Sequence, residues 1–490
     1  MNLVAEHYVR PGSRQLGLFG VAAGVAVILI SIAIVQQKVL LLTGIAAVAF
    51  AIVFPIEASL GAFAVLVPFD QVLVLGQGEA TITWAAGAFA GATLMVYGLV
   101  SGRFQLPPRA ALYWGLFALW SCASSIWAID PSRSMQWIPT VAGLFALYIV
   151  AVSFRVTRRE LSRVVSLAVA GGAVAASVVI LQFASHITHV GSTGRPEGRA
   201  SLVAGNLESD PNYLSFSLLL PFSLAVGGVL SEGSLRERTA QLIALGLTTT
   251  AILLTMSRGS LIALSATVLV YLFRFGMRKR ILIVVLIAAI PLFFLPDLFY
   301  QRMEQASSDR GSARFDIWLA GLEIVKRYPV IGTGLANFPV AYGDVAGYAH
   351  VLPHAAHRHL RDAHNIYLHI CAEMGVIGLA FFTAAIRSQM KAVTAIFRPS
   401  QVFKRLSTLP VHPAFSSRGS YDYFGIAIEA ACWGQLVAGF SGDIQWSKPF
   451  WFAFILLALL TQTGGESESN KLPLAVQGRQ GHREIPRFWQ

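Results

Sequence analysis

The sequence predicts an all-α protein: a polytopic transmembrane helical bundle of about 12–14 spans, with one long loop that contains short helices. Composition is the first reason. The 490-residue chain is 55% hydrophobic and 13% charged, with a mean hydropathy of +0.62, whereas a soluble protein carries about 25% charged residues. The second reason is that the apolar residues gather in runs of about 18 or more, long enough to cross a ~30 Å hydrocarbon layer as helices. The third is that lysine and arginine concentrate between these runs.

The apolar runs give the candidate spans in chain order. The first run, Leu16 to Val35, is too long for the apolar core of a signal peptide and lacks an obvious cleavage site, so we expect a retained helix. Pro68, Asp70 and Gln71 interrupt the third run, which predicts a broken or re-entrant segment. The fourteen candidate runs lie near residues 16–35, 39–57, 59–77, 82–100, 110–128, 138–154, 162–184, 212–230, 239–256, 260–275, 281–298, 366–386, 421–440 and 447–462.

The placement of basic residues predicts the orientation of the bundle. With the N-terminus in the cytoplasm, the cytoplasmic segments hold 24 of the 37 lysine and arginine residues, the short outer loops hold six, and the long loop holds the rest. Cytoplasmic loops of membrane proteins are enriched in these residues. We therefore expect both termini in the cytoplasm and the long loop outside. Because this topology accounts for the net charge of +12, no nucleic-acid partner is expected.

The same pattern divides the chain into regions. We expect the first eleven spans in residues 1–298, the long outer loop in 299–363, and the C-terminal spans in 364–462. A polar segment, 388–420, and a polar tail, 463–490, are expected on the cytoplasmic side. The three cysteines lie in apolar runs and suggest no disulfide framework. The chain also lacks the repeated halves that many transporters contain.

Three arginines on the outer face run against the topological bias. Arg195 and Arg199 lie in the segment before the run at 212–230, and Arg258 lies in the turn Met256-Ser257-Arg258-Gly259-Ser260. An arginine at or in a membrane is costly unless it is paired, which makes each a candidate for function. The alternative is that its side chain extends to lipid headgroups. The short turn around Arg258 favours a functional role for that residue.

The long loop begins with a predicted amphipathic helix at 312–327. Arg314 lies in its first turn, where the helix dipole disfavours a cation but favours phosphate. An arginine at this position therefore suits an anion-binding site, although a solvated surface charge is the alternative. Tyr328-Pro329 ends the helix. Apolar side chains at helical spacing, expected to pack against the membrane or the bundle, are Phe315, Trp318, Leu322 and Val325.

Histidines crowd the end of this loop. Their spacing fits no zinc signature, and no clear cysteine or carboxylate partner completes one, so we expect no metal. These histidines are His350, His354, His357, His359 and His364.

His364 differs from the others because it stands where the loop enters the run at 366–386. A histidine held at a helix start near the interface suits a general base at neutral pH, since its ordinary pKa is about 6.5. Asn365 is placed to orient it or a sugar hydroxyl. His369 and Glu373 are four residues apart and share a helix face. Asp443, between the last two runs, is another acid expected near the same plane.

These features together resemble the O-antigen ligase and O-antigen polymerase superfamily. The resemblance is firmest over residues 195–385 and includes the order of the motifs, the many spans and the late outer loop. The chain departs from the family, whose members are often described with about twelve spans, in its span count and in the long segment 388–420. The matching residues are Ser257-Arg258-Gly259, Arg314 with Trp318, Pro329 with Gly332 and Gly334, and His364-Asn365 followed by Glu373, Gly375 and Gly378.

The resemblance implies a glycosyltransferase of the bacterial inner membrane with a periplasmic active site. Its donor would be a glycan on undecaprenyl diphosphate, and its acceptor lipid A–core or a growing polysaccharide, with no cofactor. His364 would be the catalytic base, Arg258 and Arg314 would bind the diphosphate, and a lipid or polysaccharide transporter is the alternative of another class. Further substrate-binding candidates are Arg195, Arg199, Asn365, Glu373 and Asp443.

Overall fold

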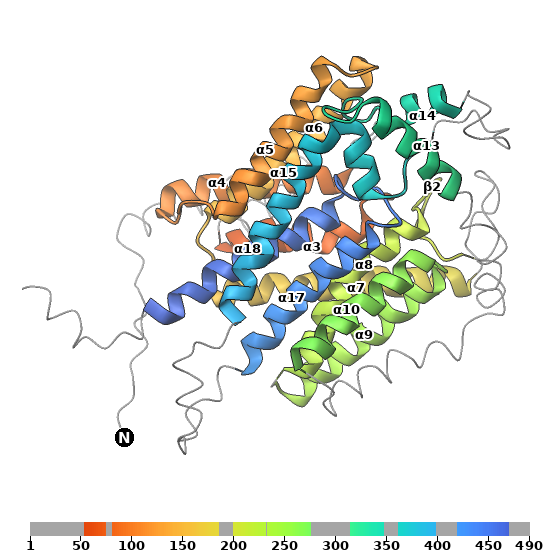
Figure 1. The fold of residues 1–490 in the computed structure, drawn as a ribbon. Helices are drawn as coiled ribbons and strands as arrows, with labels where there is room; N and C mark the ends of the chain where they lie inside the picture. The colour runs from red at the N-terminus through yellow and green to blue at the C-terminus, as the bar shows by residue number, and fades with distance from the viewer. Residues whose placement is uncertain are drawn as a thin grey trace, which may run out of the picture.

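The computed structural model describes residues 53–74, 81–185, 199–231, 233–275, 314–346, 361–397 and 419–469. These residues form a bundle of helices (Figure 1). The β structure among them is two isolated bridges and one hairpin, in which β1 (Val203–Ala204) pairs antiparallel with β2 (Leu207–Glu208). The predicted all-α class is therefore confirmed.

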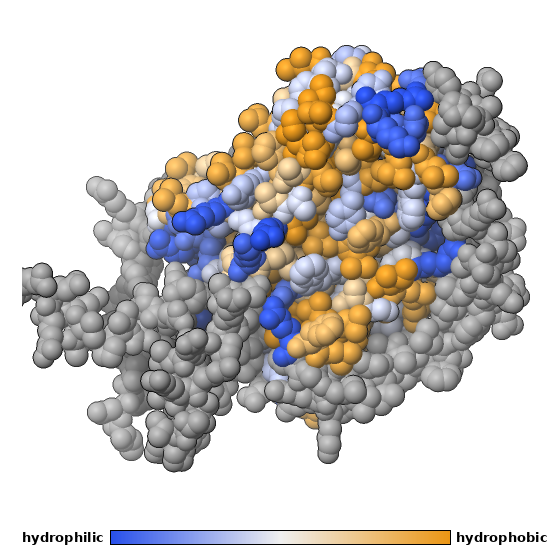
Figure 2. Space-filling model, in the orientation of Figure 1, coloured by the Kyte–Doolittle hydropathy of each residue, from blue (hydrophilic) through white to orange (hydrophobic). Residues whose placement is uncertain are grey.

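Five of the described helices are long and apolar enough to cross a membrane. Among them α8 is almost wholly enclosed by other helices, whereas most of α4 faces outward. Apolar side chains cover much of the visible face of the bundle (Figure 2), as expected for a surface in contact with lipid. The five are α4 (Ile82–Ser101), α6 (Pro131–Ser153), α7 (Arg158–Ala184), α8 (Pro211–Leu230) and α15 (Ile366–Phe397).

Further helices complete the described part of the bundle. Segments distant in sequence lie side by side, because α10 packs along α17 and α5 packs along α15. Such pairings bring the middle and the end of the chain together. These helices are α5 (Arg109–Ala123), α9 (Leu235–Leu254), α10 (Arg258–Phe275), α17 (Gly419–Ala438) and α18 (Lys448–Ser469).

The predicted interruption of the third apolar run is confirmed. The segment begins as a π-helix, Glu57–Gly61, continues as α3 (Ala62–Leu66) and ends in a 3-10 turn, Val67–Phe69. The carboxylate of Asp70, which follows, accepts a hydrogen bond from the Tyr213 hydroxyl at 2.9 Å and pairs with Lys448. The predicted runs at 16–35 and 281–298, and residues 39–52 of the second run, lie outside the described residues.

An aromatic cluster around Trp114 fills the core between α5, α15 and α18. The Trp114 ring lies 5.0 Å from Trp451 and 5.9 Å from Phe382, measured between centroids. Its indole N–H donates to Oε1 of the buried Gln389 at 2.8 Å. Aromatic pairs add to the free energy that burial of their area already provides, so this cluster fixes α15 against the bundle.

α15 is longer than the predicted run at 366–386 and is broken at Gly375. The backbone of Gly375 has φ 66° and ψ −171°, which is not helical. The break releases carbonyl groups that an intact helix would bond, and exposed backbone groups are very costly in hydrocarbon. The released carbonyls of Ala372, Glu373 and Met374 accept hydrogen bonds from Thr333 N, Gly334 N and Trp120 Nε1, at 3.0, 2.8 and 2.9 Å.

Two glycines allow the loop after α13 (Arg314–Arg327) to reach this break. A Cβ atom at Gly375 would lie 2.0 Å from the carbonyl oxygen of Val330, and one at Gly332 would lie 2.3 Å from the carbonyl of Glu373. Both residues also have positive φ, a conformation that glycine adopts without strain. The glycines quoted for the family resemblance therefore let two backbone segments touch.

The helices of the long loop, α13 and α14 (Phe338–Ala346), lie at the end of the bundle where α10 and α15 begin (Figure 1). The face of α13 that packs inward is Ile317, Ala320, Gly321 and Ile324. The predicted stripe lies beside this face: Phe315 and Leu322 are exposed, whereas Trp318 and Val325 are half-buried. The stripe that packs against the rest of the protein is thus the one that contains Ile317 and Ile324. The predicted stripe, beside it, faces outward or toward the cavity described below.

Candidate functional site

Specific contacts fix the backbone of the turn before α10. Met256 has φ 50°, and the Ser257 hydroxyl accepts a hydrogen bond from the Ser260 backbone N–H at 3.4 Å, as an N-cap residue does. Gly259 is required by close packing, since a Cβ there would lie 1.8 Å from Ser441 Oγ. Ser257 and Gly259 of the Ser-Arg-Gly motif thus each have a structural reason, and Arg258 between them is the first residue of α10.

Arg314 occupies the corresponding position on a second helix, as the first residue of α13. One turn later, the Trp318 indole N–H donates to the carbonyl oxygen of Ala363 at 3.1 Å. Ala363 itself is fully buried against α13. The start of α13 is therefore fixed beside the segment that leads into α15.

The two arginines line one cavity of about 440 Å³. Its walls come from α10, α13 and the end of α17, so it joins three helices that are distant in sequence. Two helix N-termini and two guanidinium groups border this space, and each of these features favours an anion. The lining residues are Arg258, Gly259, Ile262, Arg314, Phe315, Trp318, Val437, Phe440 and Ser441.

His364 lies at the start of α15, next to the residues that line this cavity. Its side chain is 48% exposed, and its backbone has φ 48°, a region that non-glycine residues adopt rarely. Asn365 caps the helix: its side-chain oxygen accepts from the backbone N–H groups of Tyr367 and Leu368 at 3.0 and 3.1 Å. The helix start thus presents His364 in a defined direction.

Asp443 binds the same helix start from the loop between α17 and α18. Its carboxylate accepts hydrogen bonds from the backbone N–H groups of His364 and Asn365 at 2.8 and 3.1 Å. Its Oδ2 also lies 3.6 Å from Nδ1 of His364. Burial raises the pKa of the Asp443 carboxyl. The imidazoles of His369 and His364 and the backbone N–H of His364 lower that pKa by more than burial raises it, so the net shift is downward. Asp443 is therefore held as a carboxylate beside His364.

A buried pair lies behind Asp443 on α15. His369 contacts Asp443 through Nδ1 and Glu373 through Nε2, both at 3.0 Å. Glu373 lies away from the cavity lining, with a side chain only 1% exposed. The spacing of four residues predicted that His369 and Glu373 share a helix face. His369 was not among the predicted site residues, and this spacing is the signal that could have placed it there.

Arg199 supports the turn that carries Arg258. Its Nε donates to the carbonyl oxygen of Thr255 at 2.8 Å, and one terminal nitrogen donates to Oδ1 of Asn212 at 2.9 Å. Thr255 directly precedes the Met256 turn, and Arg199 is not among the residues that line the cavity. Arg195 lies outside the described residues.

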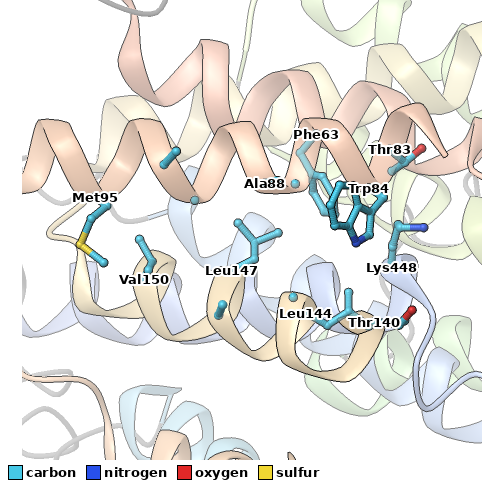
Figure 3. A pocket seen from close by; sticks show the side chains of 15 residues that line it. Phe63, Thr83, Trp84, Ala88, Met95, Thr140, Leu144, Leu147, Val150 and Lys448 are labelled. Carbon is cyan, nitrogen blue, oxygen red and sulfur yellow. The ribbon is translucent and has the colours of Figure 1, made fainter. Parts of the chain in front are cut away.

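A second cavity, of about 370 Å³, lies between α4 and α6 (Figure 3). Apolar side chains such as Leu147 and Val150 line it, with Met95 at one end and Lys448 at the other. The Lys448 ammonium lies 2.5 Å from Asp70 and donates to Thr81 at 3.1 Å. Because Asp70 already neutralises the lysine, this groove suits a lipid chain better than a diphosphate.

Within the described residues, no group of three or more histidine, cysteine, aspartate or glutamate side chains is arranged to hold a metal ion. The histidines at 350, 354, 357 and 359 lie outside those residues.

Comparison with known families identifies the region that contains this site. Residues 243–383 match the family model described as O-Antigen ligase. Over these residues the chain is similar to the O-antigen ligase family. The resemblance to the ligase and polymerase superfamily is thereby confirmed. The matched region runs from within α9 to within α15 and includes Arg258, Arg314, His364 and Glu373, whereas Asp443 lies beyond it. A search of curated proteins gives no match to the chain.

Proposed function

We propose that this protein is a glycosyltransferase of the bacterial inner membrane that moves a glycan from undecaprenyl diphosphate to an acceptor sugar hydroxyl on the periplasmic face. With lipid A–core as acceptor, it is an O-antigen ligase. One observation carries the proposal: Arg258 and Arg314, each the first residue of a helix, line one cavity beside the segment that holds His364. The similarity to the O-antigen ligase family supports a ligase- or polymerase-type activity.

The proposed reaction is a displacement at the first sugar of the donor. The acceptor hydroxyl oxygen attacks C1 and forms the new glycosidic bond, while the bond between C1 and the phosphate oxygen breaks. The electron pair of that bond leaves with undecaprenyl diphosphate, and the acceptor proton passes to His364. Histidine is the side chain most often used for this kind of proton transfer.

The arginines stabilise the negative charge that grows on the leaving diphosphate. A guanidinium group donates two parallel hydrogen bonds to phosphate oxygens, and fixed donors lower the barrier without reorganisation during the step. The N-termini of α10 and α13 add positive potential at the same place. In this proposal Arg258 and Arg314 neutralise the diphosphate without a metal ion. Arg199 holds the turn that carries Arg258, and Arg195 is a further candidate for contact with the diphosphate.

Asp443 and Asn365 support the base in the same proposal. The Asp443 carboxylate, 3.6 Å from the His364 ring, stabilises the imidazolium that forms when His364 accepts a proton, as the buried aspartate of a catalytic triad does. Asn365 orients the start of α15 through its capping hydrogen bonds. Its amide N–H groups suit a sugar hydroxyl.

The alternative within the superfamily is a polymerase, which extends an O-antigen or exopolysaccharide on the carrier. The alternative of another class is a lipid or polysaccharide transporter, for which charges at mid-membrane depth are expected. The buried Asp70 and Glu373 are each paired within the protein, with Lys448 and His369 respectively. This pairing favours a structural or positioning role over a transport path.

A reconstituted assay tests the proposal. The purified protein in liposomes would receive an oligosaccharide on undecaprenyl diphosphate and purified lipid A–core. We expect transfer to lipid A–core, and we expect His364→Ala to lower the rate by about 10²–10⁴-fold with its thermal unfolding unchanged. Chain growth on the carrier alone would instead identify a polymerase. Movement of donor across the bilayer without transfer would identify a transporter, and normal transfer by His364→Ala would overturn the assignment of the base.

A further inference from the structure

A chain of ionisable side chains leads inward from His364. Asp443 lies 3.6 Å from Nδ1 of His364 through Oδ2 and 3.0 Å from Nδ1 of His369 through Oδ1. The other ring nitrogen of His369 lies 3.0 Å from Oε1 of Glu373. That same oxygen accepts a hydrogen bond from the backbone N–H of Phe338 at 2.9 Å. The chain thus connects the exposed His364 to the first residue of α14.

The geometry around His369 constrains its protonation. Each ring nitrogen faces a carboxylate oxygen at hydrogen-bond distance, and only a doubly protonated imidazole donates from both nitrogens. A neutral ring would place a lone pair against one carboxylate. The side chains of His369 and Glu373 are only 7% and 1% exposed, so each charge needs the other to offset the cost of burial. The Phe338 ring, stacked 5.4 Å from His369, also fixes the plane of the imidazole.

We infer that His369 and Glu373 are positioning residues, which hold the Asp443 carboxylate where it fixes His364. The inference rests on the proposed function and extends it inward from the reacting groups. Asp443 accepts from the backbone N–H groups of His364 and Asn365 and from the His369 ring. Without the His369 contact, the carboxylate is free to turn away from the two backbone N–H groups and from the His364 ring.

The reason such support matters is the state of His364 itself. Its ring is half exposed and its backbone adopts a sparsely populated conformation, which is strained and persists only where the surroundings enforce it. Small displacements of a catalytic group lower rates strongly. His369 and Glu373 therefore act on the rate through the direction of His364, without touching substrate.

A double-mutant cycle tests this inference in the full-length protein, with undecaprenyl diphosphate-linked oligosaccharide as donor and lipid A–core as acceptor. We expect His369→Gln to lower kcat about tenfold or more, with KM for the donor changed less than about twofold. In a His364→Ala background the same substitution should produce no further loss, because residues that act as a unit are not additive. If His369 had a merely structural role, His369→Gln would lower kcat by the same factor in the wild-type and His364→Ala backgrounds.

A second variant and a matched control separate positioning from folding. Glu373→Gln retains the shape of the side chain and an acceptor for the N–H of Phe338, so we expect this variant to fold. We expect it to lower kcat, as His369→Gln does. Gln389→Leu, at another buried polar residue of α15, should lower the unfolding temperature and leave kcat unchanged. Full kcat in both His369→Gln and Glu373→Gln would overturn the inference while wild-type transfer persists. Absence of any transfer by the wild type would instead overturn the proposed function, and the inference with it.

Discussion

The indole N–H of Trp318 donates to the carbonyl oxygen of Ala363 at 3.1 Å, and this bond joins the helix that begins at Arg314 to the residue before His364. Ala363 packs into the same buried cluster as Ile317 and Ala320 of α13. Arg314, which we propose binds the diphosphate, and His364, the proposed base, therefore belong to one packed unit. Their separation is set by side-chain packing, although a long stretch of loop lies between them in sequence.

Trp318→Phe tests this link. The substitution retains an aromatic ring on the cavity wall but removes the donor to Ala363. We expect kcat to fall about tenfold, because a small shift of His364 relative to the diphosphate is costly. Steady-state kinetics of glycan transfer measures the effect. Trp84→Phe, at an exposed tryptophan in the groove between α4 and α6, is the control and should retain wild-type kinetics.

Arg258→Lys tests whether the arginine fork is required. Lysine preserves the charge but cannot donate two parallel hydrogen bonds to phosphate oxygens, so we expect kcat/KM to fall by about 10²–10³-fold. Arg163→Lys is the matched control, because Arg163 pairs with Glu57 at the other end of the bundle and its side chain is half exposed. Near-normal turnover by Arg258→Lys would reduce Arg258 to a contact with lipid headgroups.

Gly375→Ala tests the break in α15. The added Cβ would meet the Val330 carbonyl at 2.0 Å in a backbone of positive φ, so we expect a loss of about 3 kcal/mol or more in the free energy of unfolding. Gly91→Ala on α4 is the control, since a Cβ there meets nothing within 4 Å. Alanine in a helix is more stable than glycine by about 0.5–1 kcal/mol. Equal unfolding temperatures for the two variants would contradict this account of the break.

Asp443→Asn tests the electrostatics of the helix start. The pKa of Asp443 is lowered in the folded protein, below the ordinary value of about 3.9. Its carboxylate therefore contributes stability that is fully present above about pH 4–5 and is lost as the pH falls through the lowered value. The difference in Tm between wild type and Asp443→Asn should be constant from neutral pH down to that range and shrink below it.

The ionisable groups that interact with the Asp443 carboxylate are His364, His369 and Asp362. Their interactions with it are lost in Asp443→Asn and form part of the measured difference. Asp344→Asn, at an exposed aspartate of α14, should track wild type at every pH. A Tm difference for Asp443→Asn that grows toward acid pH would contradict the lowered pKa.

The fold class and the position of each of two arginines at the start of a helix were predictable because they depend on local sequence. Long apolar runs predict membrane helices whatever their neighbours are, and Arg258 and Arg314 each stand at a turn where a helix begins. The break at Asp70 was likewise visible, since proline and polar residues interrupt an apolar run. These signals are carried by a few consecutive residues.

The partners of the site residues were not predictable in the same way. Asp443 reaches His364 from the loop between α17 and α18, and Arg199 reaches Thr255, which lies 56 residues further along the chain. The inward face of α13 depends on which neighbours it meets, so hydrophobic spacing alone selected a neighbouring stripe. His369 carries two carboxylate contacts, and only Glu373 is near in sequence. Such pairings are set by packing between distant segments.

The break at Gly375 has a consequence for how the protein meets bilayers of different thickness. A membrane helix longer or shorter than the local hydrocarbon layer tilts or bends to match it. In α15 both sides of the break are bonded to the segment 329–334: the carbonyls of Ala372 and Glu373 accept from Thr333 N and Gly334 N, and the N–H of Val376 donates to the carbonyl of Pro329. The distal half is held as well, because Phe382 and Gln389 contact Trp114 of α5. The break therefore does not act as a hinge, and we expect a thinner or thicker membrane to be matched by a tilt of the bundle as a whole, with His364 kept in its place at the start of α15.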